Sequence, residues 1–139
     1  MTRTERLLRW VLWLTGAVLL LALVGVFMPY TLMQSSHARA GMGPLPELPV
    51  IDYLARSVSA FYALVGGLCF VLATDVRRYR PVLIFLGVIT SVYSVGIIVV
   101  DHLAGLPPWW TWGEGPATLP LGVVVAALAY RLPPPKAAD

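Results

Sequence analysis

Four long apolar runs alternate with short polar segments along the chain, and this pattern predicts the architecture. The first run, from Trp10 to Met28, contains no charged residue. About 20 apolar residues in a helix cross a hydrocarbon core of roughly 30 Å. We therefore predict an all-α membrane protein, an antiparallel four-helix transmembrane bundle that forms one integral membrane domain over residues 1–139. The expected spans are about 8–29, 52–74, 81–103 and 113–132.

The first run must be distinguished from a cleavable signal peptide, because three arginines precede it and Ala38-Arg39-Ala40 has the pattern of a cleavage site. The apolar core of a signal peptide is usually about 7–15 residues long. Here the run has 19 residues, and the cleavage-like triplet lies twelve residues beyond Met28. The pattern favours an uncleaved anchor that ends at Pro29.

The fourth run is too short to cross a membrane by itself. From Thr118 to Tyr130 it has 13 residues, which make about 20 Å of helix. Extending it back to Trp109 places four poor helix formers inside the span: Gly113, Gly115, Pro116 and Pro120. We therefore predict a broken outer segment that leads into a short helix.

Two segments are expected to cap the outer end of the bundle. One is the Trp- and Pro-rich stretch from Asp101 to Pro116. The other is the long connection over residues 31–51, in which three closely spaced prolines exclude a regular helix (Pro44, Pro46 and Pro49).

Small residues recur at helical spacing in the second and third spans. Such residues let membrane helices approach closely. In the second span they follow a strict four-residue spacing: Ala55, Ser59, Ala63 and Gly67. In the third span small and polar residues share one face that ends in a carboxylate: Gly87, Ser91, Ser94 and Asp101.

Charge decides the orientation. The net charge is +3, but charged residues make up only 12% of the chain and the basic ones stand at the ends of apolar runs, which argues against nucleic acid as a partner. With four spans, one side carries Arg3, Arg6, Arg9, Arg77, Arg78, Arg80, Arg131 and Lys136, and the other carries Arg39 and Arg56. Because cytoplasmic loops are rich in basic residues, both termini are expected in the cytoplasm. The basic turn at Arg77–Arg80 is an orientation signal or, alternatively, a contact for anionic lipid.

Three ionisable residues from three spans reach a similar depth near the outer interface. Arg56 lies about 28 Å above Asp75, Asp101 about 30 Å above Pro81, and Glu114 about 25 Å above Arg131 if each segment is helical. Ionisable groups at that depth normally find a partner. We predict that Arg56 pairs with Asp101, with Glu114 or with both.

This predicted cluster has three interpretations that the sequence leaves open. It can hold helices together, bind a ligand or lipid headgroup, or take part in catalysis or proton transfer. The neighbouring tryptophans form either an interfacial belt or the walls of a pocket. The candidate ligand-binding residues are Arg56, Asp101, Glu114, Trp109, Trp110, Trp112, His102, Asp52 and Tyr62.

Other chemistry is poorly represented. The single cysteine, Cys69, lies in an apolar run and has no partner for an internal disulfide. The two histidines, His37 and His102, belong to no zinc-binding spacing. We expect no cofactor, no metal site and no catalytic residues.

Three segments resemble a known family: Tyr53-Leu54-Ala55-Arg56-Ser57, Arg78-Tyr79-Arg80-Pro81 and Gly105-Leu106-Pro107-Pro108-Trp109-Trp110. Together they are similar to the BphX-like family of small bacterial four-span membrane proteins, over about residues 50–130. The resemblance implies the four-span architecture and a bacterial cytoplasmic (inner) membrane. It implies no activity and no catalytic residues.

Three functions are compatible with these patterns. The first is non-enzymatic binding of a small amphipathic ligand or lipid headgroup at the outer end of the bundle. The second is an accessory subunit that stabilises or recruits a larger membrane complex. The third is a proton-coupled enzyme or transporter. Besides the lipid bilayer, the expected partners are such a ligand, further copies of the chain or a larger complex.

Overall fold

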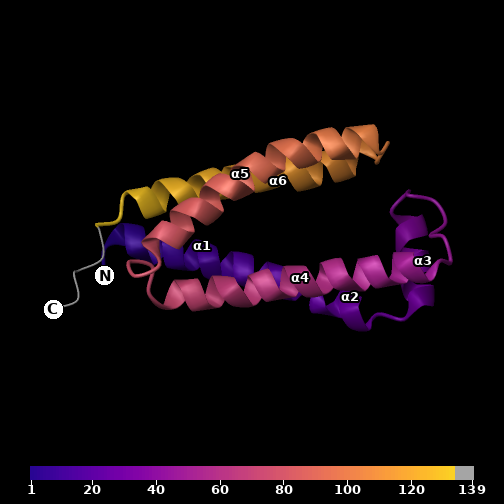
Figure 1. The fold of residues 1–139 in the computed structure, drawn as a ribbon, viewed down its shortest axis with the longest axis horizontal. Coiled ribbons are helices and arrows are strands. Elements are labelled where there is room, and N and C mark those ends of the chain that lie inside the picture. Colours follow the sequence, from indigo (N-terminus) through magenta and orange to yellow (C-terminus); the bar gives the residue numbers. More distant parts are fainter. Residues whose placement is uncertain (134–139) are drawn as a thin grey trace. The chain divides into compact units, whose positions relative to one another are not determined.

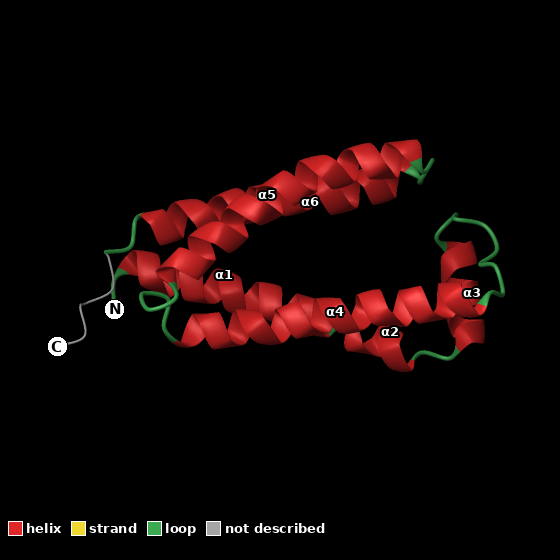
Figure 2. Ribbon diagram, in the orientation of Figure 1, coloured by secondary structure: helices red, strands yellow, loops and turns green. Residues whose placement is uncertain are grey.

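The computed structural model describes residues 1–133, and all of their regular structure is helical (Figures 1 and 2). The all-α prediction is therefore confirmed for this part of the chain, whereas Lys136 lies outside it. The helices are α1 (Arg3–Leu20), α2 (Leu23–Phe27), α3 (Tyr30–Arg39), α4 (Pro49–Thr74), α5 (Arg80–Leu103) and α6 (Pro108–Tyr130).

Four helical segments are long and apolar enough to cross a membrane. They are Arg3–Phe27, Pro49–Thr74, Arg80–Leu103 and Pro108–Tyr130, with 25, 26, 24 and 23 residues. Each corresponds to one predicted span. The first combines α1 and α2, because a turn at Leu21 and Ala22 interrupts the predicted single helix.

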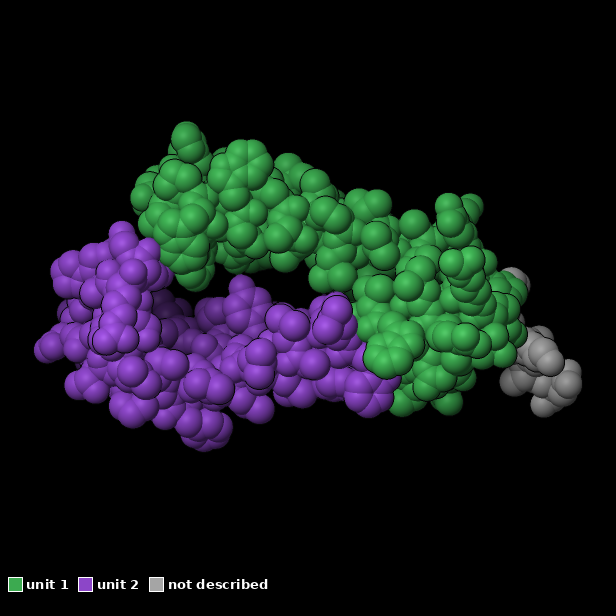
Figure 3. Space-filling model, turned by 180° about the vertical axis from the view of Figure 1, so that it is seen from behind, with its two compact units in different colours: residues 1–12, 72–139 green, residues 13–71 purple. Residues whose placement is uncertain are grey.

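The chain forms two compact units (Figure 3). The first consists of residues 1–12 together with the chain from residue 72 onward, and the second consists of residues 13–71. Helices α1 and α4 therefore each contribute one end to the first unit and their remaining length to the second.

A hydrophobic cluster in the first unit joins the ends of four helices. It contains the start of α1, the end of α4, the start of α5 and the end of α6, so two helix starts and two helix ends meet in it. Its buried members are Leu8, Leu12, Leu72, Ala73, Val76, Leu83, Val125, Leu128, Ala129 and Leu132. Most of the arginines in the sequence stand at or near these helix ends.

Helices α5 and α6 lie side by side as an antiparallel hairpin (Figure 1). Glycines bring the two backbones together. A Cβ atom on Gly87 would lie 2.5 Å from the backbone nitrogen of Ala126 and 2.7 Å from the carbonyl oxygen of Gly122. The predicted small-residue face of the third span is buried at Gly87, Ser94 and Asp101, whereas its fourth member, Ser91, is half-buried.

The predicted break in the fourth span is wrong. Helix α6 continues from Pro108 to Tyr130 with Pro116 and Pro120 inside it, and such prolines are tolerated in membrane-spanning helices when neighbouring groups satisfy the freed carbonyls. The carbonyls that Pro116 and Pro120 leave without an intrahelical N–H are those of Trp112 and Pro116, four residues before each proline. Gly115, one of the predicted helix-breaking residues, faces α5 together with Gly122, and both permit close packing.

The outer cap is also different from the prediction. The tryptophans at positions 109, 110 and 112 lie in the first turns of α6 rather than in an irregular cap. The 31–51 connection contains a helix, α3, that its composition did not suggest. Only the proline-containing part that follows it is irregular, as predicted, and α4 begins at Pro49.

In the second unit, α4 packs against α1 and α2 through small residues. A Cβ atom on Gly66 would lie 2.9 Å from the Gly16 carbonyl oxygen, and one on Gly25 would lie 2.6 Å from the Ser59 hydroxyl oxygen. Ala63 is buried between these contacts. The predicted ridge is therefore correct at Ser59 and Ala63 and wrong at Gly67, which has open space around it.

Candidate functional site

The most unusual polar group of the first unit is the carboxylate of Asp101, in the last turn of α5. Its residue is only 2% exposed. Its Oδ2 atom is buried and, among the described residues, has no hydrogen-bond partner. Buried polar groups in proteins are nearly always hydrogen-bonded, so this atom requires an explanation.

The pairing of α5 with α6 places Asp101 opposite the start of α6. About two turns of α5 before it, the Ser94 and Thr118 hydroxyls are 2.8 Å apart, and Gly115 packs against Ile98. In an antiparallel pair, moving along α5 from Ser94 to Asp101 corresponds to moving back along α6 from Thr118 to about Thr111. The tryptophans of α6 therefore lie at the level of Asp101.

Glu114 orients one of these tryptophans. The Trp110 indole Nε1–H donates to the Glu114 carboxylate at 2.7 Å, one helical turn away. The rings of Trp109 and Trp110 meet edge to face, with centroids 5.6 Å apart. Trp112 projects outward and is 72% exposed. The hairpin thus combines a fixed indole ring with a buried carboxylate at the same level.

The second unit contains the predicted arginine. Arg56 Nε donates to both carboxylate oxygens of Asp52, at 2.9 and 3.0 Å. Its Nη1 donates to the Val26 carbonyl at the end of α2, at 2.6 Å. Both contacts come from the same unit, so Arg56 joins α4 to α2 and satisfies a helix-terminal carbonyl.

The structure brings together only some of the predicted residues. Asp52 pairs with Arg56, and Glu114 pairs with Trp110. Arg56 belongs to the second unit, whereas Asp101 and Glu114 belong to the first. The predicted pairing of Arg56 with these two carboxylates therefore stays a prediction. Of the remaining candidates, His102 and Tyr62 are exposed on α5 and α4.

The loop after α3 is held by contacts within the second unit. The Tyr30 hydroxyl donates to the Pro46 carbonyl, and the Gln34 amide donates to Glu47 at 3.0 Å. Burial raises the pKa of the Tyr30 hydroxyl, and the charges of Glu47 and Asp52 raise this pKa further. The hydroxyl therefore keeps its proton and remains a donor.

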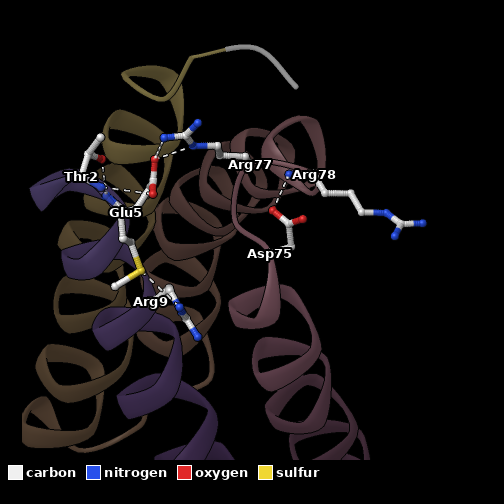
Figure 4. A network of polar contacts seen from close by, with 7 residues as sticks. Thr2, Glu5, Arg9, Asp75, Arg77 and Arg78 are labelled. Carbon is white, nitrogen blue, oxygen red and sulfur yellow. Dashed lines mark hydrogen bonds and ion pairs between the residues drawn. The ribbon is translucent and has the colours of Figure 1, made fainter. Parts of the chain in front are cut away.

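A second polar network lies at the opposite end of the first unit (Figure 4). Thr2 and Glu5 form a reciprocal capping box at the start of α1, with backbone N–H donors to the partner side chain at 3.2 Å in each direction. Glu5 is 5% exposed and also accepts from the Arg77 guanidinium at the turn between α4 and α5. The sequence signal for this network is the capping-box signature Thr-x-x-Glu at Thr2 and Glu5, which the predictions above did not include.

Comparison with known proteins gives no information on the function of this chain. Protein-family models, curated proteins and solved structures give no match to the chain. The resemblance to the BphX-like family therefore stays a prediction. Within residues 1–133, no group of three His, Cys, Asp or Glu side chains is arranged to hold a metal ion.

Proposed function

We propose that the chain is an integral protein of a bacterial cytoplasmic membrane, with four spans and both termini in the cytoplasm. The support is the surface of its long helices. At most 28% of the residues in the most apolar window of each helix are buried. Large apolar side chains point outward, including Leu14, Leu64 and Phe85, which are 69%, 67% and 63% exposed. Apolar surface of this extent suits lipid rather than water.

The proposed orientation rests on the arginines. The start of α1, the turn between α4 and α5, and the end of α6 meet at the hydrophobic cluster, and these segments carry seven of the arginines. Because cytoplasmic segments are rich in basic residues, these arginines support a cytoplasmic location for this end. Asp101, at the other end of α5, then lies at the outer side.

We propose further that the outer end of the α5–α6 hairpin binds a small amphipathic molecule without chemical conversion. The observation that carries this proposal is the buried Oδ2 atom of Asp101, which has no hydrogen-bond partner among the described residues. An ionisable residue inside a membrane segment is a functional candidate by default. An ammonium or hydroxyl group on a ligand supplies the missing donor, and the tryptophans of α6 provide an apolar surface beside it.

Asp101→Asn tests this binding function. We expect the full-length protein in mild detergent to retain added tetradecylamine, seen by native mass spectrometry. Asp101→Asn should weaken retention about tenfold or more, because a hydrogen bond to a charged group contributes about 1.5–3 kcal/mol. Tetradecanol should bind more weakly than the amine, and myristate should not bind.

Asp75→Asn is the matched control, since Asp75 is an exposed carboxylate at the opposite end of the first unit. This variant should retain the amine like the unmodified protein. Equal retention by Asp101→Asn, or equal retention of myristate, would show that Asp101 is not the binding group. A larger protein co-purifying in fixed ratio in place of the amine would favour an accessory subunit.

A further inference from the structure

The arginine-rich end of the first unit carries far more positive charge than its own carboxylates neutralise. Its arginines are Arg3, Arg6, Arg9, Arg77, Arg78, Arg80 and Arg131. Among residues 1–133, the carboxylates of the same segments are Glu5 and Asp75. These segments therefore carry seven positively charged arginines and two negatively charged carboxylates.

Internal contacts occupy a few of these arginines. Arg77 pairs with the buried carboxylate of Glu5 (Figure 4). Arg80 donates to the carbonyl oxygens of Ala129 and Tyr130 at the end of α6, each at 3.2 Å. Both side chains thus join separate helix ends, and their role in the fold is accounted for.

Arg9 is half-buried and contacts the Met1 sulfur, and the other four arginines remain available to a partner. Arg3, Arg6, Arg78 and Arg131 are exposed, and within the described residues none has a carboxylate partner. In Figure 4 the Arg78 side chain extends away from the network, while Asp75 accepts only its backbone N–H, at 3.0 Å.

The hydrophobic cluster fixes these free arginines around one end of the helices. Arg131 adjoins buried Leu132, and Arg78 follows buried Val76 by two residues. Arg6 lies in the same turn of α1 as buried Leu8. The free guanidinium groups therefore come from the three segments that the cluster and the Glu5–Arg77 pair hold together.

We propose that this end, defined by Arg3, Arg6, Arg78 and Arg131, binds the headgroups of anionic phospholipids in the cytoplasmic leaflet. The inference rests on the membrane insertion proposed above but is independent of the ligand at Asp101. Guanidinium groups match phosphate geometry with two parallel hydrogen bonds, and basic residues next to a span attract anionic lipid. Because apolar helices begin beside these arginines, the phosphate and the acyl chains of one lipid are contacted together.

The test uses the full chain in nanodiscs that contain equal amounts of phosphatidylglycerol and phosphatidylcholine. Native mass spectrometry of the released protein measures the ratio of the two lipids that stay bound. We expect phosphatidylglycerol to be enriched. The combined variant Arg3→Gln, Arg78→Gln and Arg131→Gln should lower this enrichment about tenfold or more.

Two controls separate charge from fold. Arg39→Gln removes an exposed arginine of the second unit and should leave the enrichment unchanged. The combined variant Arg3→Lys, Arg78→Lys and Arg131→Lys keeps the charge and should retain most of the enrichment. Equal binding of both lipids, or the same enrichment in the glutamine variant, would overturn the inference. If the unmodified chain did not enter nanodiscs, the proposed membrane insertion would be overturned as well. This outcome is seen before any lipid ratio is measured, so the two failures are distinguishable.

Discussion

Gly87→Ala should destabilise the α5–α6 hairpin by about 1–3 kcal/mol, because overpacking a close contact costs about this much. The added methyl group would lie 2.5 Å from the Ala126 nitrogen, 2.7 Å from the Gly122 oxygen and 2.8 Å from the Ala126 Cα atom. All three are backbone atoms, so no side-chain rotation relieves the overlap and the two helices must separate. Unfolding in mixed micelles, followed by circular dichroism, measures the loss.

Gly96→Ala is the matched control on the same helix. A Cβ atom at Gly96 meets nothing within 4 Å, and alanine is a better helix former than glycine. This variant should be as stable as the unmodified protein or slightly more stable. If both variants unfolded alike, close packing of α6 on Gly87 would be contradicted.

Glu5→Gln should cost about 1–2 kcal/mol of stability. Removing one member of a fully buried ion pair costs about 3–5 kcal/mol, but the Arg77 side chain is 41% exposed, so water compensates part of the loss. The substitution leaves the Arg77 guanidinium without its counter-charge and weakens the contact between α1 and the α4–α5 turn. The same micelle unfolding experiment measures it.

Asp75→Asn serves as the control for this second change. Asp75 is exposed and accepts only the backbone N–H of Arg78, a role that asparagine fills equally well. Its effect should stay within about 0.5 kcal/mol. A loss at Asp75 equal to that at Glu5 would mean that overall charge, rather than the Glu5–Arg77 contact, stabilises this end.

The second and third spans could be predicted from sequence because residues next to each boundary mark where the helix begins or ends. Pro81 lies in the first turn of α5, and the turn before it concentrates charge between two apolar runs. The fourth span could not be predicted in this way. Proline and glycine propensities describe an isolated segment, whereas α6 continues through its prolines while packed along α5. This packing joins residues far apart in the sequence, such as Gly87 and Ala126.

The small-residue ridge of α4 shows how a spacing rule can mislead. Four residues turn a helix by about 400°, so a strict four-residue pattern drifts by about 40° at each step. Gly67 has therefore left the face defined by Ser59, while Gly66 has stayed on it. The structure accordingly places Gly66, not Gly67, against the Gly16 carbonyl.

Depth counting did not predict the contact that Arg56 makes on its own helix. The common level of Arg56, Asp101 and Glu114 stays a prediction, because these residues belong to two separate units. Depth counting placed Arg56 beside carboxylates from other spans, yet Asp52 stands four residues earlier on the same helix. Side chains at this spacing are neighbours on a helix surface, so this local pair is the simpler expectation. The burial of Asp101 had no sequence signal beyond its place on the small-residue face, since burial depends on how α6 covers it.

Cysteine labelling in intact cells tests the central claim, a four-span membrane protein with its arginine-rich end inside. In a Cys69→Ala background, single cysteines replace exposed Ser36, Ala104 or Pro133. A membrane-impermeant maleimide should label positions 36 and 104 in intact bacteria, and position 133 only after lysis. Labelling of position 133 in intact cells, or protection of position 104, would contradict the proposed topology and with it the outer position of Asp101.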